Sequence, residues 1–224
     1  MDRVQLKKQA KEQIRGKIGI LFVITLIIAL ISFAAMFILS FIPFVGSLAA
    51  SIIVTPAFAL SLARIYINVV GGKNASVNDT FSGFDDFWSA FKVTFLVGLF
   101  TFLWSLLFII PGIIKAYSYS MSLYVLAENK GMPALEAIDR SKKMTEGHKM
   151  ELFVLELSFI GWMLLVGITF GLAGIYVIPY MYATEVNYYN EMKGAVKAAP
   201  TASAAPAPEV IDEPKTDSDT PDAE

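Results

Sequence analysis

The sequence has no cysteine and a single histidine, His148. The absence of cysteine excludes disulfide bonds, thiolate catalysis and cysteine-ligated metals. One imidazole leaves no partner for a histidine metal site or a histidine proton relay. Charged residues make up only 17% of the 224 residues, whereas hydrophobic residues make up 55%. We therefore predict no metal site and no cofactor, and we expect no nucleic acid as a partner.

Charge is missing altogether from three long runs. No residue from Ile18 to Ala63 is charged, and one helix of that length would measure about 69 Å, over twice the hydrocarbon core of a bilayer. This run must therefore cross a membrane and turn back within itself. Residues 93–114 and 157–184 are also uncharged. The pattern predicts an all-α, polytopic membrane protein.

Turn residues divide these runs into six expected membrane helices, arranged as three hairpins over 18–70, 92–128 and 150–190. Unpaired backbone is not tolerated in lipid, so each proline should lie at a turn or in a first helical turn. Pro56 falls within the second helix, where it marks either a kink or a later helix start. The residues expected at the hairpin turns are Pro43, Pro111, Gly112, Gly171, Gly174 and Pro179.

Short amphipathic helices are expected beside the hairpins. The basic segment 1–17 carries a thin apolar stripe at helical spacing. Aromatic side chains share one helical face over about 79–91, and small or apolar side chains share a face over about 133–146. Such helices lie in the plane of the membrane surface. The membrane domain is therefore expected to cover 18–192, with interfacial helices between its hairpins.

Lysine and arginine lie on one side of this expected topology. They are concentrated in residues 1–17 and in the loop before the fifth helix, whereas the turns on the other side have almost none. The positive-inside rule therefore predicts a multi-pass plasma-membrane protein with both termini in the cytoplasm. Residues 193–224 are acidic, rich in proline and alanine, and free of aromatic residues, which predicts a disordered cytoplasmic tail.

A few polar residues interrupt the apolar segments near their cytoplasmic ends. Arg64, Glu156 and Glu185 lie at similar expected depths, and Asn187 is close to the last of them. Charge within a membrane is costly, so these four residues are a candidate intramembrane polar cluster. In the simpler alternative, Arg64 extends to the headgroups and both glutamates face water or loops.

Small residues in the fifth helix suggest a contact surface for another helix. Ser158 and Gly161 allow a neighbouring helix to approach closely, and Ser158 can also form a hydrogen bond. Trp162 lies too deep for the nearer interface, so its ring is expected to contact a neighbouring helix. These three residues are the predicted helix-packing patch.

Several short motifs resemble those of one known protein family. They are Ile110-Pro111-Gly112, Ser141, Gly147-His148-Lys149, the stretch Leu157 to Trp162, and Pro179-Tyr180. On these motifs the chain resembles, over about residues 1–192, the bacterial integral-membrane family known only as domain of unknown function nine-seven-five. The resemblance implies a bacterial membrane protein, and it implies no activity.

The sequence favours a non-enzymatic membrane protein that binds lipid or another membrane protein. Anionic lipid headgroups are expected partners of its cytoplasmic lysines and arginines. The alternative is a small transporter or exporter component that uses the Arg64, Glu156 and Glu185 cluster. A lipid-acting enzyme is less favoured, because we identify no catalytic residue: no second catalytic group accompanies either glutamate.

Overall fold

The computed structural model describes residues 3–40 and 46–198, and within these ranges the chain is all-helical, without a strand. The predicted all-α class is therefore confirmed. Two expectations fall outside the described residues: the turn residue Pro43 and most of the acidic tail, residues 199–224.

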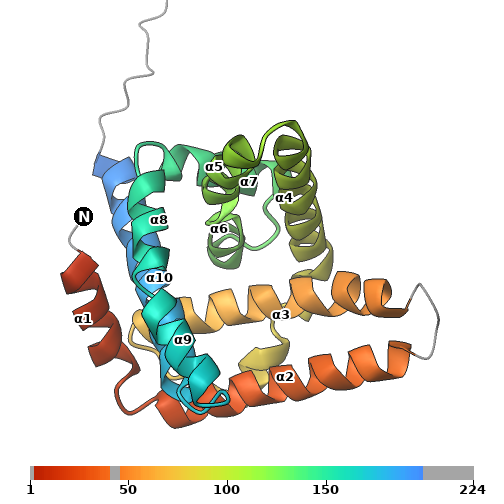
Figure 1. Ribbon diagram of the computed structural model, residues 1–224, viewed down its shortest axis with the longest axis vertical. Helices are drawn as coiled ribbons and strands as arrows, with labels where there is room; N and C mark the ends of the chain where they lie inside the picture. The colour runs from red at the N-terminus through yellow and green to blue at the C-terminus, as the bar shows by residue number, and fades with distance from the viewer. Residues whose placement is uncertain (1–2, 41–45, 199–224) are drawn as a thin grey trace, which may run out of the picture.

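The N-terminal part forms a short helix followed by a long hairpin (Figure 1). Helix α1 (Arg3–Ile14) ends in a turn through Gly16, whose φ of +79° is a conformation that glycine adopts at little cost. Helices α2 (Ile18–Ser40) and α3 (Gly46–Val70) then run side by side. Pro56 lies inside α3, so this helix does not begin after the proline.

The segment expected as one amphipathic helix over 79–91 has a different structure. Two short 3₁₀ turns, η1 (Val77–Phe81) and η2 (Phe84–Asp86), precede helix α4, which begins at Phe87. Gly83 lies directly on α3, where an added Cβ would be 1.9 Å from the Ala57 carbonyl oxygen. The Gly83 N–H also donates to Ser61 Oγ at 2.8 Å. This contact with α3 interrupts the helix that the aromatic spacing predicts.

The second hairpin turns earlier than predicted. Helix α4 (Phe87–Leu107) and helix α5 (Ile109–Tyr119) are joined at Phe108, whose backbone is extended (φ −157°, ψ 141°). Pro111 is therefore in the first turn of α5, where a missing N–H costs nothing. Gly112 is not a turn residue either, because it allows α5 to contact α4. A Cβ there would lie 2.1 Å from Ser105 Oγ.

The next four helices have 12 residues or fewer, whereas the last has 25. They are α6 (Ser122–Glu128), α7 (Ala134–Thr145), α8 (Lys149–Leu157), α9 (Ile160–Ile168) and α10 (Gly174–Ala198). Helix α7 occupies the position of the amphipathic helix expected over 133–146. The third hairpin turns at Gly171, whose φ is +91°, and Gly174 is the first residue of α10. Pro179 lies inside α10 rather than at a turn.

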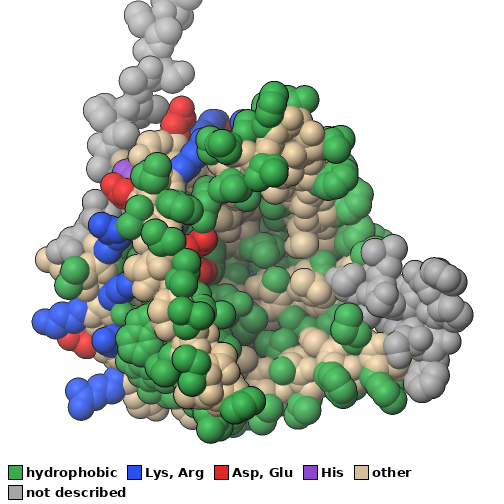
Figure 2. Space-filling model, viewed as in Figure 1, with side chains coloured by type: hydrophobic (Ala, Val, Ile, Leu, Met, Phe, Trp, Pro, Cys, Tyr) green, Lys and Arg blue, Asp and Glu red, His purple; other side chains and the backbone are tan. Residues whose placement is uncertain are grey.

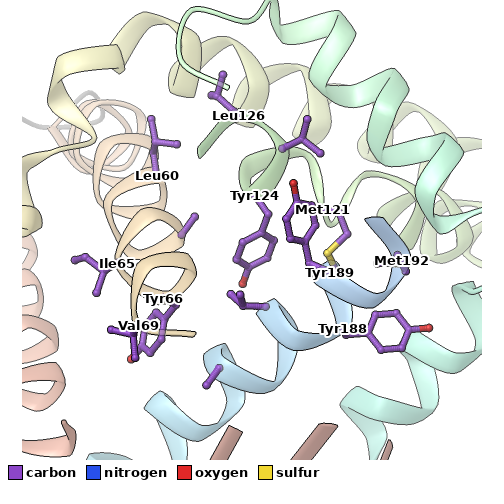
Figure 3. Close-up of a cluster of buried hydrophobic side chains, with 14 of the residues drawn as sticks. Leu60, Ile65, Tyr66, Val69, Met121, Tyr124, Leu126, Tyr188, Tyr189 and Met192 are labelled. Atoms are coloured by element: carbon purple, nitrogen blue, oxygen red, sulfur yellow. The ribbon is translucent and has the colours of Figure 1, made fainter. Parts of the chain in front are cut away.

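A core of buried side chains lies where α3, α6 and α10 meet (Figure 3). Tyr66 of α3 stacks on Tyr182 of α10 with ring centroids 4.8 Å apart. Tyr124 of α6 lies beside Tyr189 of α10, whereas Tyr188 points away from them, toward α8. Helix α1 packs along α10 and buries its apolar stripe, Leu6, Ala10 and Ile14.

Outside this core the surface is strongly apolar. Hydrophobic side chains cover α2 and α4, while lysines and arginines gather over α1 (Figure 2). In the described ranges, three helical stretches are long and apolar enough to cross a membrane: Ile18–Ile38, Val77–Leu107 and Lys149–Ile168. At most 17% of the most apolar window of each is buried by the rest of the protein.

Candidate functional site

The predicted polar cluster does not form around Arg64. The Arg64 guanidinium forms an ion pair with Asp86 of η2 and also donates to the Ser82 carbonyl oxygen. Both partners belong to the segment that crosses over α3. Arg64 therefore fixes this segment to α3, and it makes no ion pair with Glu156 or Glu185.

The other three members of the predicted cluster have separate partners. Glu156 accepts a hydrogen bond from the Tyr117 hydroxyl at 2.6 Å, and Glu185 accepts one from the Tyr124 hydroxyl at 2.8 Å. Asn187 forms a reciprocal amide pair with a residue of α1: its Nδ2 donates to Gln13 Oε1 at 2.8 Å, and Gln13 Nε2 donates back at 3.1 Å.

The helix-packing patch is only partly a contact surface. Ser158 Oγ accepts a hydrogen bond from Lys7 Nζ of α1 at 2.6 Å, and the Trp162 ring lies 6.2 Å from the Tyr180 ring of α10. Gly161 is different, because an added Cβ there would have no heavy atom of another residue within 4 Å. Helix α9 contacts α10 through aromatic rings, and within the described residues no neighbouring helix approaches Gly161.

Tyrosine–carboxylate hydrogen bonds connect the helices, and the sequence pattern does not indicate them. Besides the two pairs above, the Tyr188 hydroxyl donates to Glu151 at 2.9 Å and the Tyr189 hydroxyl donates to Glu128 at 2.8 Å. Each pair joins two different helices. The partners are 37 to 61 residues apart in the sequence, so no local spacing indicates them.

The main cavity lies where α3, η1, α6, α7 and α10 converge and has a volume of about 990 Å³. We call it the basic cavity, because its lining includes five basic and two acidic side chains. The basic residues are Arg64, Lys130, Arg140, Lys143 and Lys193, and the acidic ones are Asp79 and Glu128. Of the predicted polar cluster, only Arg64 lines it.

Both acidic side chains of the basic cavity are occupied. The Glu128 carboxylate accepts hydrogen bonds from Lys193 at 2.5 Å and from Tyr189 at 2.8 Å. The Asp79 carboxylate accepts one from the Ser76 backbone N–H at 2.8 Å, as part of the cap of η1. Both carboxylates therefore already have hydrogen-bond partners within the protein.

The basic residues contributed by α7 form only exposed ion pairs within their own helix. Arg140 pairs with Glu136, and Lys143 pairs with Asp139, each at 2.8 Å along the same exposed helix surface. The hydrogen bond from Lys143 lowers the pKa of the Asp139 carboxyl below its ordinary value. Exposed pairs of this kind contribute only about 0.3–0.5 kcal/mol, so the two cations are available to a stronger anion.

A metal centre has no support among the residues that the structure describes. No group of three or more histidine, aspartate and glutamate side chains is placed there to hold a metal ion.

Over residues 3–40 and 46–198 the fold defines a class: an all-helical protein with three helical stretches that are apolar and long enough to cross a membrane. Comparison with protein families identifies the family. The chain belongs to the family described as Protein of unknown function (DUF975), which matches residues 1–118 and 106–196. The family expected from the sequence motifs is therefore confirmed. Neither the curated proteins nor the solved structures include a significant match to the chain.

Proposed function

We propose that this protein is a non-enzymatic, lipid-binding component of the bacterial plasma membrane. Three hairpins, contributing six crossing segments, embed it in the bilayer, and both chain termini are cytoplasmic. The observation that carries this proposal is the turn between α9 and α10, which is apolar, exposed and internally hydrogen-bonded.

The α9–α10 turn leaves none of its backbone N–H groups unpaired. Each N–H from Thr169 to Val177 donates to an oxygen within the protein, including Ala173 to Thr169 Oγ1 at 3.0 Å. A turn in water needs no such completeness, because water accepts the remaining hydrogen bonds. Lipid offers no acceptor, so a turn in hydrocarbon must satisfy its own backbone.

Phe170 at the tip of this turn has an unusual backbone conformation. Its φ is +50°, and its N–H donates to the Gly167 carbonyl oxygen while that of Gly171 donates to Val166, which is a Schellman motif. Glycine usually occupies this left-handed position, where other residues cost ~1–2 kcal/mol. The phenylalanine nevertheless stands there with 99% of its surface exposed. Insertion of the ring into lipid offsets this cost.

The tip of the second hairpin has the same character. Phe108 is 68% exposed, and the large side chains on either side of it are also exposed, namely Leu106, Leu107, Ile109 and Ile110. The α8–α9 stretch of 20 residues is about 30 Å long if straight, which matches the hydrocarbon core. We therefore place the α9–α10 tip at the far boundary of the hydrocarbon, with the beginning of α8 and the lysine-rich loop before it at the cytoplasmic surface, at the opposite end of the molecule (Figure 1).

Transport gains no support from the predicted polar cluster, because its members have separate partners and only Arg64 lines the basic cavity. An enzyme gains none either, since both carboxylates that line the basic cavity, Asp79 and Glu128, are already hydrogen-bonded to groups of the protein. Lipid binding needs neither arrangement. It needs exposed apolar helices and a basic surface at one end, and both are present.

Cysteine accessibility tests this proposal, and the chain has no native cysteine to interfere. Single variants Phe170→Cys and Glu146→Cys would be exposed to a membrane-impermeant maleimide, first in intact cells and then in inverted vesicles. We expect Glu146→Cys to react only in inverted vesicles, and Phe170→Cys to react in neither until detergent is added. Reaction of Phe170→Cys in inverted vesicles would overturn the topology. Rapid reaction in intact cells would place the tip in water and overturn its embedding.

A further inference from the structure

We propose that the basic cavity binds a phosphate-bearing anion, of the kind carried by the headgroup of an anionic phospholipid. The assignment to lipid rests on the membrane role proposed above, whereas the phosphate chemistry rests on the cavity itself. Glycerol phosphate in solution has the same chemistry, and the experiment below separates the two sources.

The charge of the basic cavity favours an anion. Its five basic side chains face two carboxylates, and both carboxylates are already hydrogen-bonded. Lys130 has no ion pair with any residue that the structure describes. Arg140 and Lys143 have only exposed partners on their own helix. A phosphate that enters the cavity could therefore bind Lys130, Arg140 and Lys143 without breaking a strong ion pair.

Phosphate also fits the geometry of these donors. A guanidinium presents a planar fork of N–H groups that can bind two phosphate oxygens at once, and an ammonium adds a compact charge. Arg140 and Lys143 lie nearly one turn apart on α7, so their side chains point to the same side of the helix. The Asn68 side-chain amide adds a further donor in the lining, since it has no hydrogen-bond partner among the described residues.

The size and the remaining lining suit an amphiphile rather than a bare ion. A volume of about 990 Å³ far exceeds one phosphate and is at the upper end of the ~300–1,000 Å³ usual for ligand pockets. Ile67, Val125, Ala127 and Met144 supply apolar wall beside the charged groups. A phosphate with an attached glycerol backbone would therefore contact both kinds of surface.

The position of the basic cavity agrees with this ligand. Its cations come from the loop after α6, from α7 and from the end of α10, which the positive-inside rule places at the cytoplasmic surface. That leaflet carries anionic lipids, and basic pockets between helices at this level bind their headgroups. Arg64 lines the inner wall of the basic cavity, and its ion pair with Asp86 fixes its position.

The test uses the full-length protein in nanodiscs and in detergent. Native mass spectrometry would count phosphatidylglycerol and phosphatidylcholine retained on the protein after release from mixed nanodiscs. Titration calorimetry in detergent would measure binding of glycerol 3-phosphate. We expect one retained phosphatidylglycerol and a clear preference for it over phosphatidylcholine. The double variant Arg140→Gln/Lys143→Gln should reduce that preference about thirtyfold, since each basic residue contributes on the order of 1 kcal/mol.

Two further variants keep the result specific to the basic cavity. Lys8→Gln/Arg15→Gln removes the same number of positive charges from exposed positions on α1 and directly after it, outside the cavity, and should lower the preference for phosphatidylglycerol far less than Arg140→Gln/Lys143→Gln does. Ala127→Phe keeps every charge but fills part of the cavity, and it should weaken retention. Circular dichroism melting would establish that each variant is folded before its binding is compared.

The outcomes separate the possibilities. Equal retention of both lipids together with no glycerol phosphate binding overturns the proposal, as does a preference that persists in the Arg140→Gln/Lys143→Gln variant. Glycerol phosphate binding that this variant loses, without a lipid preference, supports the phosphate site and assigns it to a soluble ligand. None of these results bears on membrane embedding, which the cysteine labelling measures separately.

Discussion

The region where α6, α8 and α10 meet differs sharply from the tips of the hairpins. In the first region, buried tyrosines such as Tyr188 and Tyr189 donate to carboxylates on neighbouring helices. At the tips, Phe108 and Phe170 project from the protein and contact no buried core. The protein itself supplies the partners in the first region, whereas in the proposed membrane embedding lipid would supply them at the tips.

The largest expected effect comes from placing a charge at a tip. Aspartate tolerates the left-handed backbone at position 170, so Phe170→Asp changes mainly the side chain. A carboxylate buried in lipid costs up to about 3 kcal/mol, so we expect the variant to unfold at a clearly lower temperature in lipid nanodiscs. Phe170→Leu is the control and should keep a Tm close to that of the unchanged protein. An unchanged Tm for Phe170→Asp would mean that the tip lies in water.

Two glycines test helix contact within the hairpins. Gly112→Ala forces a Cβ against Ser105 and should lower the unfolding free energy by about 1–3 kcal/mol, read as a lower Tm in detergent. Gly161→Ala meets no atom within 4 Å and removes a helix-destabilising glycine. It should therefore raise the unfolding free energy by up to ~1 kcal/mol, read as a slightly higher Tm. A large loss at Gly161 instead would reveal a helix contact there, such as one with a second copy of the chain.

Each tyrosine–carboxylate hydrogen bond should contribute somewhat less to stability. Tyr124→Phe leaves the Glu185 carboxylate without its hydroxyl partner and should cost about 1–2 kcal/mol. Tyr176→Phe removes a hydroxyl that has no hydrogen bond among the described residues, and its effect should be near zero. Thermal unfolding of both variants in the same detergent compares them. Equal melting temperatures would show that these hydrogen bonds contribute nothing measurable.

The smallest change in stability is expected for a substitution on α7. Lys143→Gln breaks one exposed ion pair with Asp139, so the change in stability should stay within about 0.5 kcal/mol. The melting temperature checks this directly. A loss above 1 kcal/mol would mean that the Lys143 ammonium supports the fold, and the lipid-retention test would then need Arg140→Gln alone.

Local sequence signals predicted the helices better than the turns. Gly171 was predicted at a turn and lies in one, because its left-handed conformation is a local property of glycine. Pro111 was predicted at a turn but lies in the first turn of α5. Proline suits both positions for the same reason, its missing N–H, so its sequence position alone cannot separate them.

Contacts between distant residues could not be predicted from spacing. The expected partners of Glu156 and Glu185 were charges at similar depth, yet the structure pairs them with tyrosines from α5 and α6. Glu185 is partly buried, and a phenol supplies a hydrogen-bond donor to its carboxylate without burying a second charge. Gly83 is a similar case. Its contact with α3 interrupts a helix that local periodicity favours, and only the folded chain shows it.

The contact between α1 and α10 also constrains the order of events during synthesis. Asn187 donates to the Leu6 carbonyl oxygen across 181 residues of chain, so α1 is synthesised long before the helix that it binds. At about 5–20 residues per second, α1 waits roughly 10–35 s for this partner. During that interval α1 can contact α3 but not α10, the helix along which it packs. Docking of α1 onto α10 can therefore occur only after the chain has been synthesised through Asn187.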